Sequence, residues 1–171
     1  QIGKGEWAKH SLSIPWDQYM KAYDAFCPAE NWAEELVKSA KAAGCKYITL
    51  TSRHHDGFCL WDSGSSFENF TVMNENCGCK RDLIKEYCDA FRAKDLAVGL
   101  YYSPTDWRFP GFFIPLLYKQ NAIAMREQCH KQINELTTKY GKIDIMWYDA
   151  GEDWYLSFAR WPACAEEGIK A

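Results

Sequence analysis

Three amphipathic helical segments alternate with three short apolar strands along the chain, and this alternation most constrains the fold. Strands separated by helices in strict alternation pair in parallel through crossovers, which are right-handed in nearly all proteins. We therefore expect an α/β fold with a parallel sheet. The predicted helices span 30–43, 80–94 and 116–140, and the predicted strands span 46–52, 97–103 and 142–149.

The helical segments carry apolar residues three and four positions apart, which is the spacing of one helix face. Gly44 and Gly141 follow the first and third helix as stop signals, because glycine readily adopts the backbone conformation that ends a helix. The apolar faces should pack on the sheet. They comprise Trp32, Leu36, Val37 and Ala40 in the first helix and Leu83, Ile84, Tyr87 and Phe91 in the second.

An open wound sheet and a closed (β/α)8 TIM-like barrel both satisfy this alternation. No glycine-rich phosphate loop follows any strand, and polar residues gather at the carboxyl end of each one, which favours the barrel. A complete barrel takes about 250 residues, whereas this chain has 171. We expect one domain, 1–171, that forms only part of a barrel and whose open edges are covered by another chain or a further segment.

The composition limits the kind of partner. Lys and Arg number 20 against 23 Asp and Glu, so no polybasic face points to nucleic acid or an anionic membrane. No apolar run is long enough to span a membrane. Aromatic residues make up 16% of the chain, and exposed aromatic faces suit the C–H surfaces of sugars, although most of these rings should lie in the core.

The eight cysteines do not follow the spacing of a zinc site. Cys77 and Cys79 form a C-x-C without a second pair at zinc-ligand distance, so we expect no structural metal ion. The other cysteines stand among apolar neighbours, as buried free thiols do. These are Cys27, Cys45, Cys59, Cys88, Cys129 and Cys164.

The carboxyl ends of the three predicted strands carry histidines, aromatic residues and acids. In a barrel these ends converge on one mouth, so we expect the side chains to face a common pocket. One histidine alone could be a packed structural residue, but two together beside an acid and a tryptophan favour a site. The set comprises His54, His55, Tyr101, Tyr102, Asp106, Trp107, Trp147 and Asp149.

The third strand places a carboxylate next to an indole. Period-two alternation puts Ile145, Trp147 and Asp149 on one face. A carboxylate at the strand tip with an indole two residues earlier is typical of an anionic nucleophile or a sugar clamp against a stacking wall. The alternative is that Asp149 only caps the following turn.

Three long motifs resemble one known family. KYITLTSRHHDGFCLWDS, GLYYSPTDW and GKIDIMWYDAGEDW occur in the order and at the spacing found in family 29 glycoside hydrolases, the α-L-fucosidases. The resemblance runs from Gly5 to about Trp154. It implies a retaining (β/α)8-type exo-glycosidase acting on fucosylated oligosaccharides or glycoconjugates, without a cofactor, in a periplasmic, secreted or lysosomal setting.

The resemblance also implies residue roles. Asp149 corresponds to the nucleophile that attacks the anomeric carbon of fucose. Between the two adjacent tyrosines we expect Tyr102 to point inward, because it is nearer the strand tip. The implied sugar-binding residues are His54, His55, Tyr102, Trp147 and, at the rim, Trp7.

The second carboxyl group of the reaction is not assigned by the motifs. Retaining hydrolysis needs two carboxyl groups about 5 to 5.5 Å apart. The available candidates for the acid/base role are Glu6, Glu152 and Asp153, although acids in loops are usually solvated. The family's His-Trp-Gly strand is not found before Gly5. We therefore expect the nucleophile half of the machinery and no turnover by this segment alone.

Two other functions remain as alternatives. A fucose-binding domain would keep the sugar pocket without turnover. A metal-dependent hydrolase would use His54, His55 and Asp56. Adjacent strand residues point to opposite faces, so neighbouring histidines seldom bind one ion unless the strand has already ended.

Overall fold

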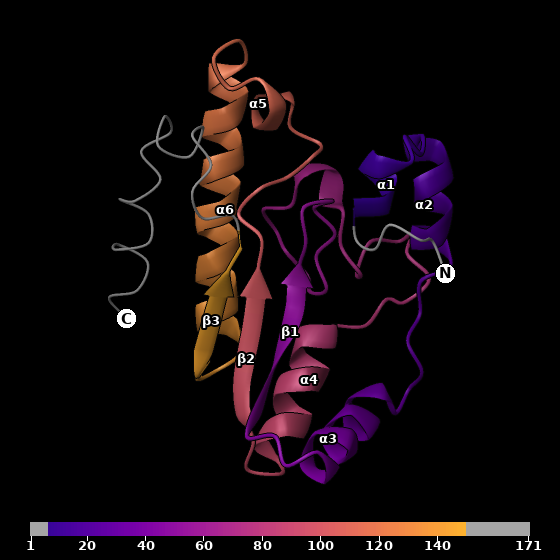
Figure 1. Cartoon of the computed structure of the whole chain (residues 1–171), viewed down its shortest axis with the longest axis vertical. Helices are drawn as coiled ribbons and strands as arrows, with labels where there is room; N and C mark the ends of the chain where they lie inside the picture. Colours follow the sequence, from indigo (N-terminus) through magenta and orange to yellow (C-terminus); the bar gives the residue numbers. More distant parts are fainter. Residues whose placement is uncertain (1–6, 150–171) are drawn as a thin grey trace.

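The computed structural model describes residues 7–149, and Figure 1 shows their arrangement. Three strands stand side by side with their carboxyl ends at the top, and the helices flank them. The helices are α1 (Ala8–Ser11), α2 (Trp16–Asp24), α3 (Trp32–Ala42), α4 (Leu83–Arg92), α5 (Pro110–Phe113) and α6 (Lys119–Lys139), with a short 3-10 turn at Phe67–Asn69. The strands are β1 (Tyr47–Arg53), β2 (Ala97–Tyr102) and β3 (Ile145–Tyr148).

The sheet is parallel and has the order β1-β2-β3. Thr51 pairs with Tyr101, and Tyr101 pairs with Trp147, so these three residues form one row across the sheet. The parallel pairing and the first two predicted strands are therefore confirmed, whereas the third strand, predicted over 142–149, spans only Ile145–Tyr148.

One hydrophobic core joins the sheet to the three longer helices. Val98, Leu100 and Tyr102 of β2 are fully buried and share this core with residues of α3, α4 and α6. Alternate residues of a strand face opposite sides, so these helices cover the same face of β2. A doubly wound sheet has helices on both faces, and the described part of the chain has the one-sided arrangement instead.

The helix ends follow local sequence signals. The Asp82 carboxylate accepts a hydrogen bond from the Lys85 backbone amide at 2.9 Å and so caps the amino end of α4. Gly44 and Gly141 have φ of 74° and 70° and stand just beyond α3 and α6. This left-handed conformation costs other residues about 1–2 kcal/mol, so the two predicted stop signals are confirmed.

The predicted third helix begins three residues too early. Residues 116–118 form a turn in which the backbone amides of Leu117 and Tyr118 both donate to the Ile114 carbonyl. The chain reverses here because Gly111 of α5 packs directly against α6, where its amide donates to the Asn121 side chain at 2.7 Å. Helices α1, α2 and α5 were not predicted. At 21 residues α6 is the longest helix, and no helix within 7–149 is both long and apolar enough to cross a membrane.

The expectation of buried thiols is wrong for two cysteines. Cys27 and Cys45 are exposed, because Cys27 lies in the loop after α2 and Cys45 follows the glycine that ends α3. Cys164 lies outside the described residues. The remaining five are buried: Cys59, Cys77, Cys79, Cys88 and Cys129.

Gly99→Ala should destabilise the sheet by about 1–3 kcal/mol, the usual cost of overpacking a core. A Cβ at this position would lie 2.7 Å from the Ile48 carbonyl oxygen and 2.9 Å from the Thr49 hydroxyl, both on the paired strand. Urea unfolding monitored by circular dichroism measures the change. Gly64→Ala is the matched control, because the nearest atom to its Cβ would lie 3.9 Å away. Equal stabilities of the two variants would contradict this account.

Candidate functional site

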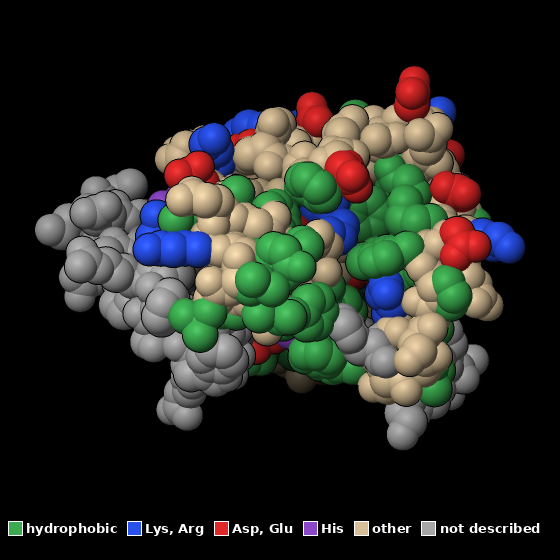
Figure 2. All heavy atoms as spheres, turned by 90° about the horizontal axis from the view of Figure 1, so that it is seen from above, with side chains coloured by type: hydrophobic (Ala, Val, Ile, Leu, Met, Phe, Trp, Pro, Cys, Tyr) green, Lys and Arg blue, Asp and Glu red, His purple; other side chains and the backbone are tan. Residues whose placement is uncertain are grey.

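The three strands end at one edge of the sheet, and the residues that follow them come together there (Figure 1). Figure 2 views the molecule from this side: hydrophobic side chains gather in the middle of the face, with acidic and histidine atoms visible among them. The candidate site is therefore a polar centre within an aromatic and apolar surround.

Asp149 lies at the centre of the site, directly after β3. Its Oδ2 accepts a hydrogen bond from the Tyr101 hydroxyl and lies 3.6 Å from His55 Nε2. Its backbone amide donates to the Tyr102 carbonyl at 3.1 Å, which extends the parallel pairing by one residue. The side chain is 40% exposed. The carboxylate is thus held in place by its neighbours and still open to an incoming molecule.

The two adjacent histidines point into the same region. Strand β1 ends at Arg53, and a turn begins at once, closed by the hydrogen bond from the Gly57 amide to the His54 carbonyl at 3.0 Å. The rule that neighbouring strand residues face opposite sides therefore no longer applies. The two imidazole rings lie 4.1 Å apart between centroids, and the His54 ring is stacked on Tyr101 at 5.8 Å.

Two buried hydroxyl groups fix the orientation of His55. Its Nδ1 lies 2.5 Å from Ser103 Oγ and 2.9 Å from Thr105 Oγ1. Both residues follow β2 and are fully buried. The Trp107 amide also donates to the His55 carbonyl at 2.8 Å. Because Nδ1 is occupied on the inner side, Nε2 is the nitrogen presented to Asp149.

Aromatic rings border this polar centre. Trp7 contacts both His55 and Trp107, with ring centroids 5.0 and 4.9 Å apart. On the other side, Trp147 meets Tyr101 edge-on at 5.5 Å and is 60% exposed. Flat apolar walls around a carboxylate and imidazoles suit a ligand that has both hydroxyl groups and apolar C–H faces.

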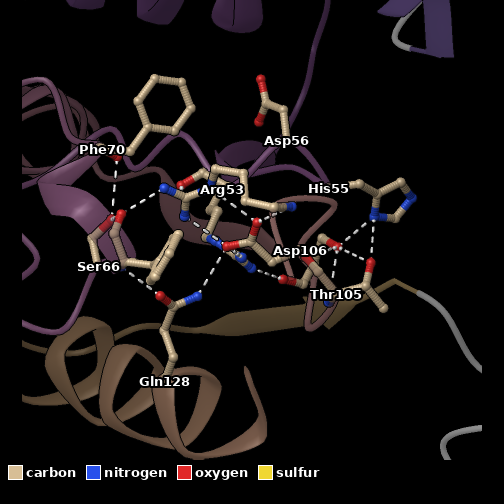
Figure 3. A network of polar contacts seen from close by, with 12 residues as sticks. Arg53, His55, Asp56, Ser66, Phe70, Thr105, Asp106 and Gln128 are labelled. Carbon is tan, nitrogen blue, oxygen red and sulfur yellow. Dashed lines mark hydrogen bonds and ion pairs between the residues drawn. The ribbon is translucent and has the colours of Figure 1, made fainter. Parts of the chain in front are cut away.

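A buried ion pair lies beside His55 in the polar network that Figure 3 shows. Arg53 Nη2 donates to Asp106 Oδ2 at 2.6 Å, and neither side chain is exposed. Arg53 Nη1 also donates to the Ser103 carbonyl at 2.5 Å. The guanidinium group therefore joins the end of β1 to the loop that carries Ser103 and Thr105.

Further groups complete the surroundings of Asp106. Arg108 donates to both carboxylate oxygens, at 3.0 and 2.7 Å, and Gln128 of α6 donates to Oδ2 at 3.1 Å. Burial alone would raise the pKa of the Asp106 carboxyl group, but the charges of Arg53 and Arg108 outweigh it, so the pKa lies below its ordinary value. Asp106 is thus a charged structural residue and is not available as a proton donor.

The structure changes two expectations for the site. Tyr102 does not point into it: the side chain is fully buried and its hydroxyl donates to Gln132 on α6 at 2.7 Å. The inward tyrosine is Tyr101, because alternation places it on the face opposite the helices. Asp106 is likewise buried in the ion-pair network instead of facing the pocket.

The other site residues lie as follows. His54, His55, Trp7, Trp107, Trp147 and Asp149 gather near one another at the strand ends. Glu6, Glu152 and Asp153 lie outside the described residues. The supporting roles of Arg53, Ser103 and Thr105 were not predicted, although an arginine at the end of an apolar strand is a signal that could have suggested a buried partner.

The possible metal ligands differ from the expected set. One atom from each of His54, His55 and Asp149 lies within 4.8 Å of the others. Asp56, the acid considered with the histidines, instead accepts a hydrogen bond from the Tyr19 hydroxyl at 2.8 Å. In the structure, the acid that lies close to the two histidines is therefore Asp149 and not Asp56.

Comparison with known proteins gives consistent matches. The family model for alpha-L-fucosidase matches residues 4–165. The plasma alpha-L-fucosidase of Rattus norvegicus is 38% identical over 128 residues, which cover 71% of this chain and 25% of the relative. The chain thus spans about a quarter of that relative's length.

Solved structures agree with the sequence comparison. Alpha-L-fucosidase isoenzyme 1 from Paenibacillus thiaminolyticus is 37% identical with a TM-score of 0.73, covering 87% of this chain and 38% of that one. A GH29 alpha-L-fucosidase from Bacteroides thetaiotaomicron, crystallised as a trapped covalent intermediate with 2-fluoro-fucosyl fluoride, is 30% identical with a TM-score of 0.78. The match covers 96% of this chain and 39% of that one.

Asp106→Asn should lower the free energy of unfolding by about 3–5 kcal/mol at neutral pH, because it leaves the buried Arg53 charge without its anionic partner. Since the pKa of Asp106 is lowered on folding, the ionised carboxylate contributes stability above its unfolded pKa of about 3.9. This contribution is lost as the pH falls through the folded value. Urea unfolding across acidic pH measures both effects.

The control for this experiment is Asp89→Asn. Asp89 pairs with Lys85 on the exposed surface of α4, where an ion pair contributes about 0.2–1 kcal/mol at most. If Asp106→Asn cost no more than this control, the buried pair would not support the site.

Proposed function

The chain belongs to the α-L-fucosidase family, and on this premise we propose that it contributes the nucleophile and the sugar-binding groups of a retaining exo-glycosidase that hydrolyses α-L-fucosides. The observation that carries the proposal is the position of Asp149. Its carboxylate lies between the Tyr101 hydroxyl and His55 Nε2, remains partly exposed, and is bordered by aromatic rings.

In this proposal Asp149 attacks the anomeric carbon of fucose. A bond forms between a carboxylate oxygen and that carbon while the bond to the leaving oxygen breaks, and an acid partner gives its proton to the leaving oxygen. Water then cleaves the fucosyl ester and restores the carboxylate. The hydrogen bond from Tyr101 and the nearby imidazole hold the attacking oxygen in position, which reduces the entropy lost on the way to the transition state.

The acid/base partner remains a separate part of the proposal. Asp106 is excluded from this role by its two arginine partners, and Asp56 is engaged by Tyr19. We keep Glu6, Glu152 and Asp153 as candidates, together with a carboxyl group supplied by another chain or a further segment.

The sugar hydroxyls are proposed to bind the two imidazoles. His55 Nε2 and the ring of His54 face the space beside Asp149, and an imidazole can donate or accept a hydrogen bond. Trp147 and Trp7 are proposed to contact the apolar faces of fucose. Tyr101 replaces Tyr102 as the tyrosine of the pocket, because its hydroxyl contacts the proposed nucleophile.

We further propose that the sheet is part of a (β/α)8 TIM-like barrel. The placement of α3, α4 and α6 on one face of β2 supports this proposal, since a barrel has its helices on the outside only. The residues at the strand ends also lie where barrel enzymes have their active sites.

Asp149→Ala should remove nearly all hydrolysis of an aryl α-L-fucoside by an active preparation that contains this chain, because the covalent route is lost. Added azide should restore turnover and give the β-fucosyl azide, since the small anion attacks from the side vacated by the carboxylate. Release of the aryl group and mass spectrometry of the product provide the measurements.

The matched control is the exposed carboxylate change Asp89→Asn, which should leave the rate unchanged. Wild-type turnover in Asp149→Ala would rule out Asp149 as the nucleophile. Fucose binding without any release of the aryl group by a wild-type preparation that also contains the acid/base partner would instead support the alternative, a sugar-binding domain without turnover.

His54→Ala and His55→Ala should each weaken fucose binding by about 1–3 kcal/mol, the cost of leaving a buried polar group without its partner. The loss should be smaller for deoxyfucose analogues that lack the contacted hydroxyl. Isothermal titration calorimetry with fucose and the analogues tests this. Equal losses for every sugar would show that the histidines act only on the fold.

A further inference from the structure

We propose that His54, His55 and Asp149 also bind a divalent transition metal ion such as Zn²⁺, and that the ion inhibits the site by occupying the atoms that the sugar requires. The inhibition rests on the proposed function, whereas the metal binding does not. The site would thus respond to metal ions without using one for catalysis.

The positions of the ligand atoms support the proposal. One atom from each of the three side chains lies within 4.8 Å of the other two, and His55 Nε2 is 3.6 Å from Asp149 Oδ2. Tetrahedral Zn²⁺ with bonds of about 2.0–2.2 Å places its ligands about 3.3 Å apart. The widest separation therefore has to shorten by at most about 1.5 Å.

The ligand types are those of an accessible zinc site. Zn²⁺ binds imidazole nitrogen and carboxylate oxygen, and sites with three protein ligands leave a fourth position open. The adjacency of the histidines is no obstacle here, because β1 has ended at Arg53 and both rings lie on the same side.

Surrounding groups provide the outer contacts that metal-binding histidines normally have. His55 Nδ1 is held by the hydroxyls of Ser103 and Thr105, so Nε2 is presented in a fixed direction. The Tyr101 hydroxyl does the same for the Asp149 carboxylate. Such outer contacts typically change metal affinity 10- to 100-fold, and they distinguish this cluster from an incidental group of surface ligands.

The proposed consequence is competition between metal and sugar. A metal ion takes the imidazole lone pairs that would otherwise meet the sugar hydroxyls, and it neutralises the carboxylate that would attack the anomeric carbon. Zn²⁺ should therefore raise the apparent KM for an α-L-fucoside and leave kcat unchanged, and a chelator should reverse the effect. Mg²⁺ should have little effect, because it prefers oxygen ligands and dehydrates reluctantly.

Binding of Zn²⁺ alone is the first experiment, measured by calorimetry, with visible absorption of Co²⁺ as an independent report of coordination by the same ligands. The chain is prepared as Cys27→Ser/Cys45→Ser, because these two exposed thiols could bind the ion elsewhere. His54→Gln and Asp149→Asn should each weaken Zn²⁺ binding at least tenfold. Ser103→Ala/Thr105→Val, which keeps all three ligands, should weaken it about tenfold.

The experiments test the metal site separately from the proposed glycosidase function. Unchanged Zn²⁺ affinity in His54→Gln and Asp149→Asn, in variants with native circular dichroism, would overturn the metal site whatever the activity. Zn²⁺ binding that depends on these ligands would support the metal site even in this segment alone, for which no turnover is expected. Activity that disappears in chelator and returns with Zn²⁺ would overturn the inhibitory role, since the ion would then be required.

Discussion

The ion pair between Arg53 and Asp106 is the interaction on which the rest of the site depends. It joins the end of β1 to the loop after β2, and it is buried with further donors from Arg108 and Gln128. Losing either member of a buried ion pair is costly, because the other charge would be left buried without its partner. The chain segments that carry His55, Ser103 and Thr105 are therefore fixed relative to one another before any ligand arrives.

Because the buried ion pair fixes these segments, the part of the site around Asp149 can remain exposed. Asp149 follows β3, keeps its backbone hydrogen bond to β2, and presents its carboxylate between Tyr101 and His55. A nucleophile must be accessible, yet its position must be well defined. Here the Tyr101 hydroxyl and the His55 imidazole fix the position of the carboxylate and leave part of it exposed. The same features make the cluster a reasonable ligand set for a metal ion.

The sequence predicted the elements that depend on local patterns. The apolar faces of α3 and α4 and the strands β1 and β2 lie where periodicity indicated, because one face of each element is buried against a single core. The third strand lies within its predicted range but is shorter. Local patterns did not predict correctly where α6 begins. There the close packing of Gly111 on α6 decides where the helix begins, and no spacing of apolar residues reports such a contact. Exposure of Cys27 and Cys45 was missed for a related reason, since apolar neighbours in sequence need not be neighbours in space.

For the candidate site, the sequence by itself determined that histidines, aromatic residues and an aspartate follow consecutive parallel strands, and hence that they meet at one edge. The sequence also contains the three motifs that indicated the family. The tertiary structure alone decided which tyrosine faces Asp149, because the helices cover the face of β2 that holds Tyr102 and leave Tyr101 on the other. It likewise decided that Asp106 is buried and that both histidines share one side. The roles of Tyr101 and Asp106 depend on contacts between residues some fifty positions apart in the chain, and a side chain's partner at that range is set by packing, which a linear pattern does not encode.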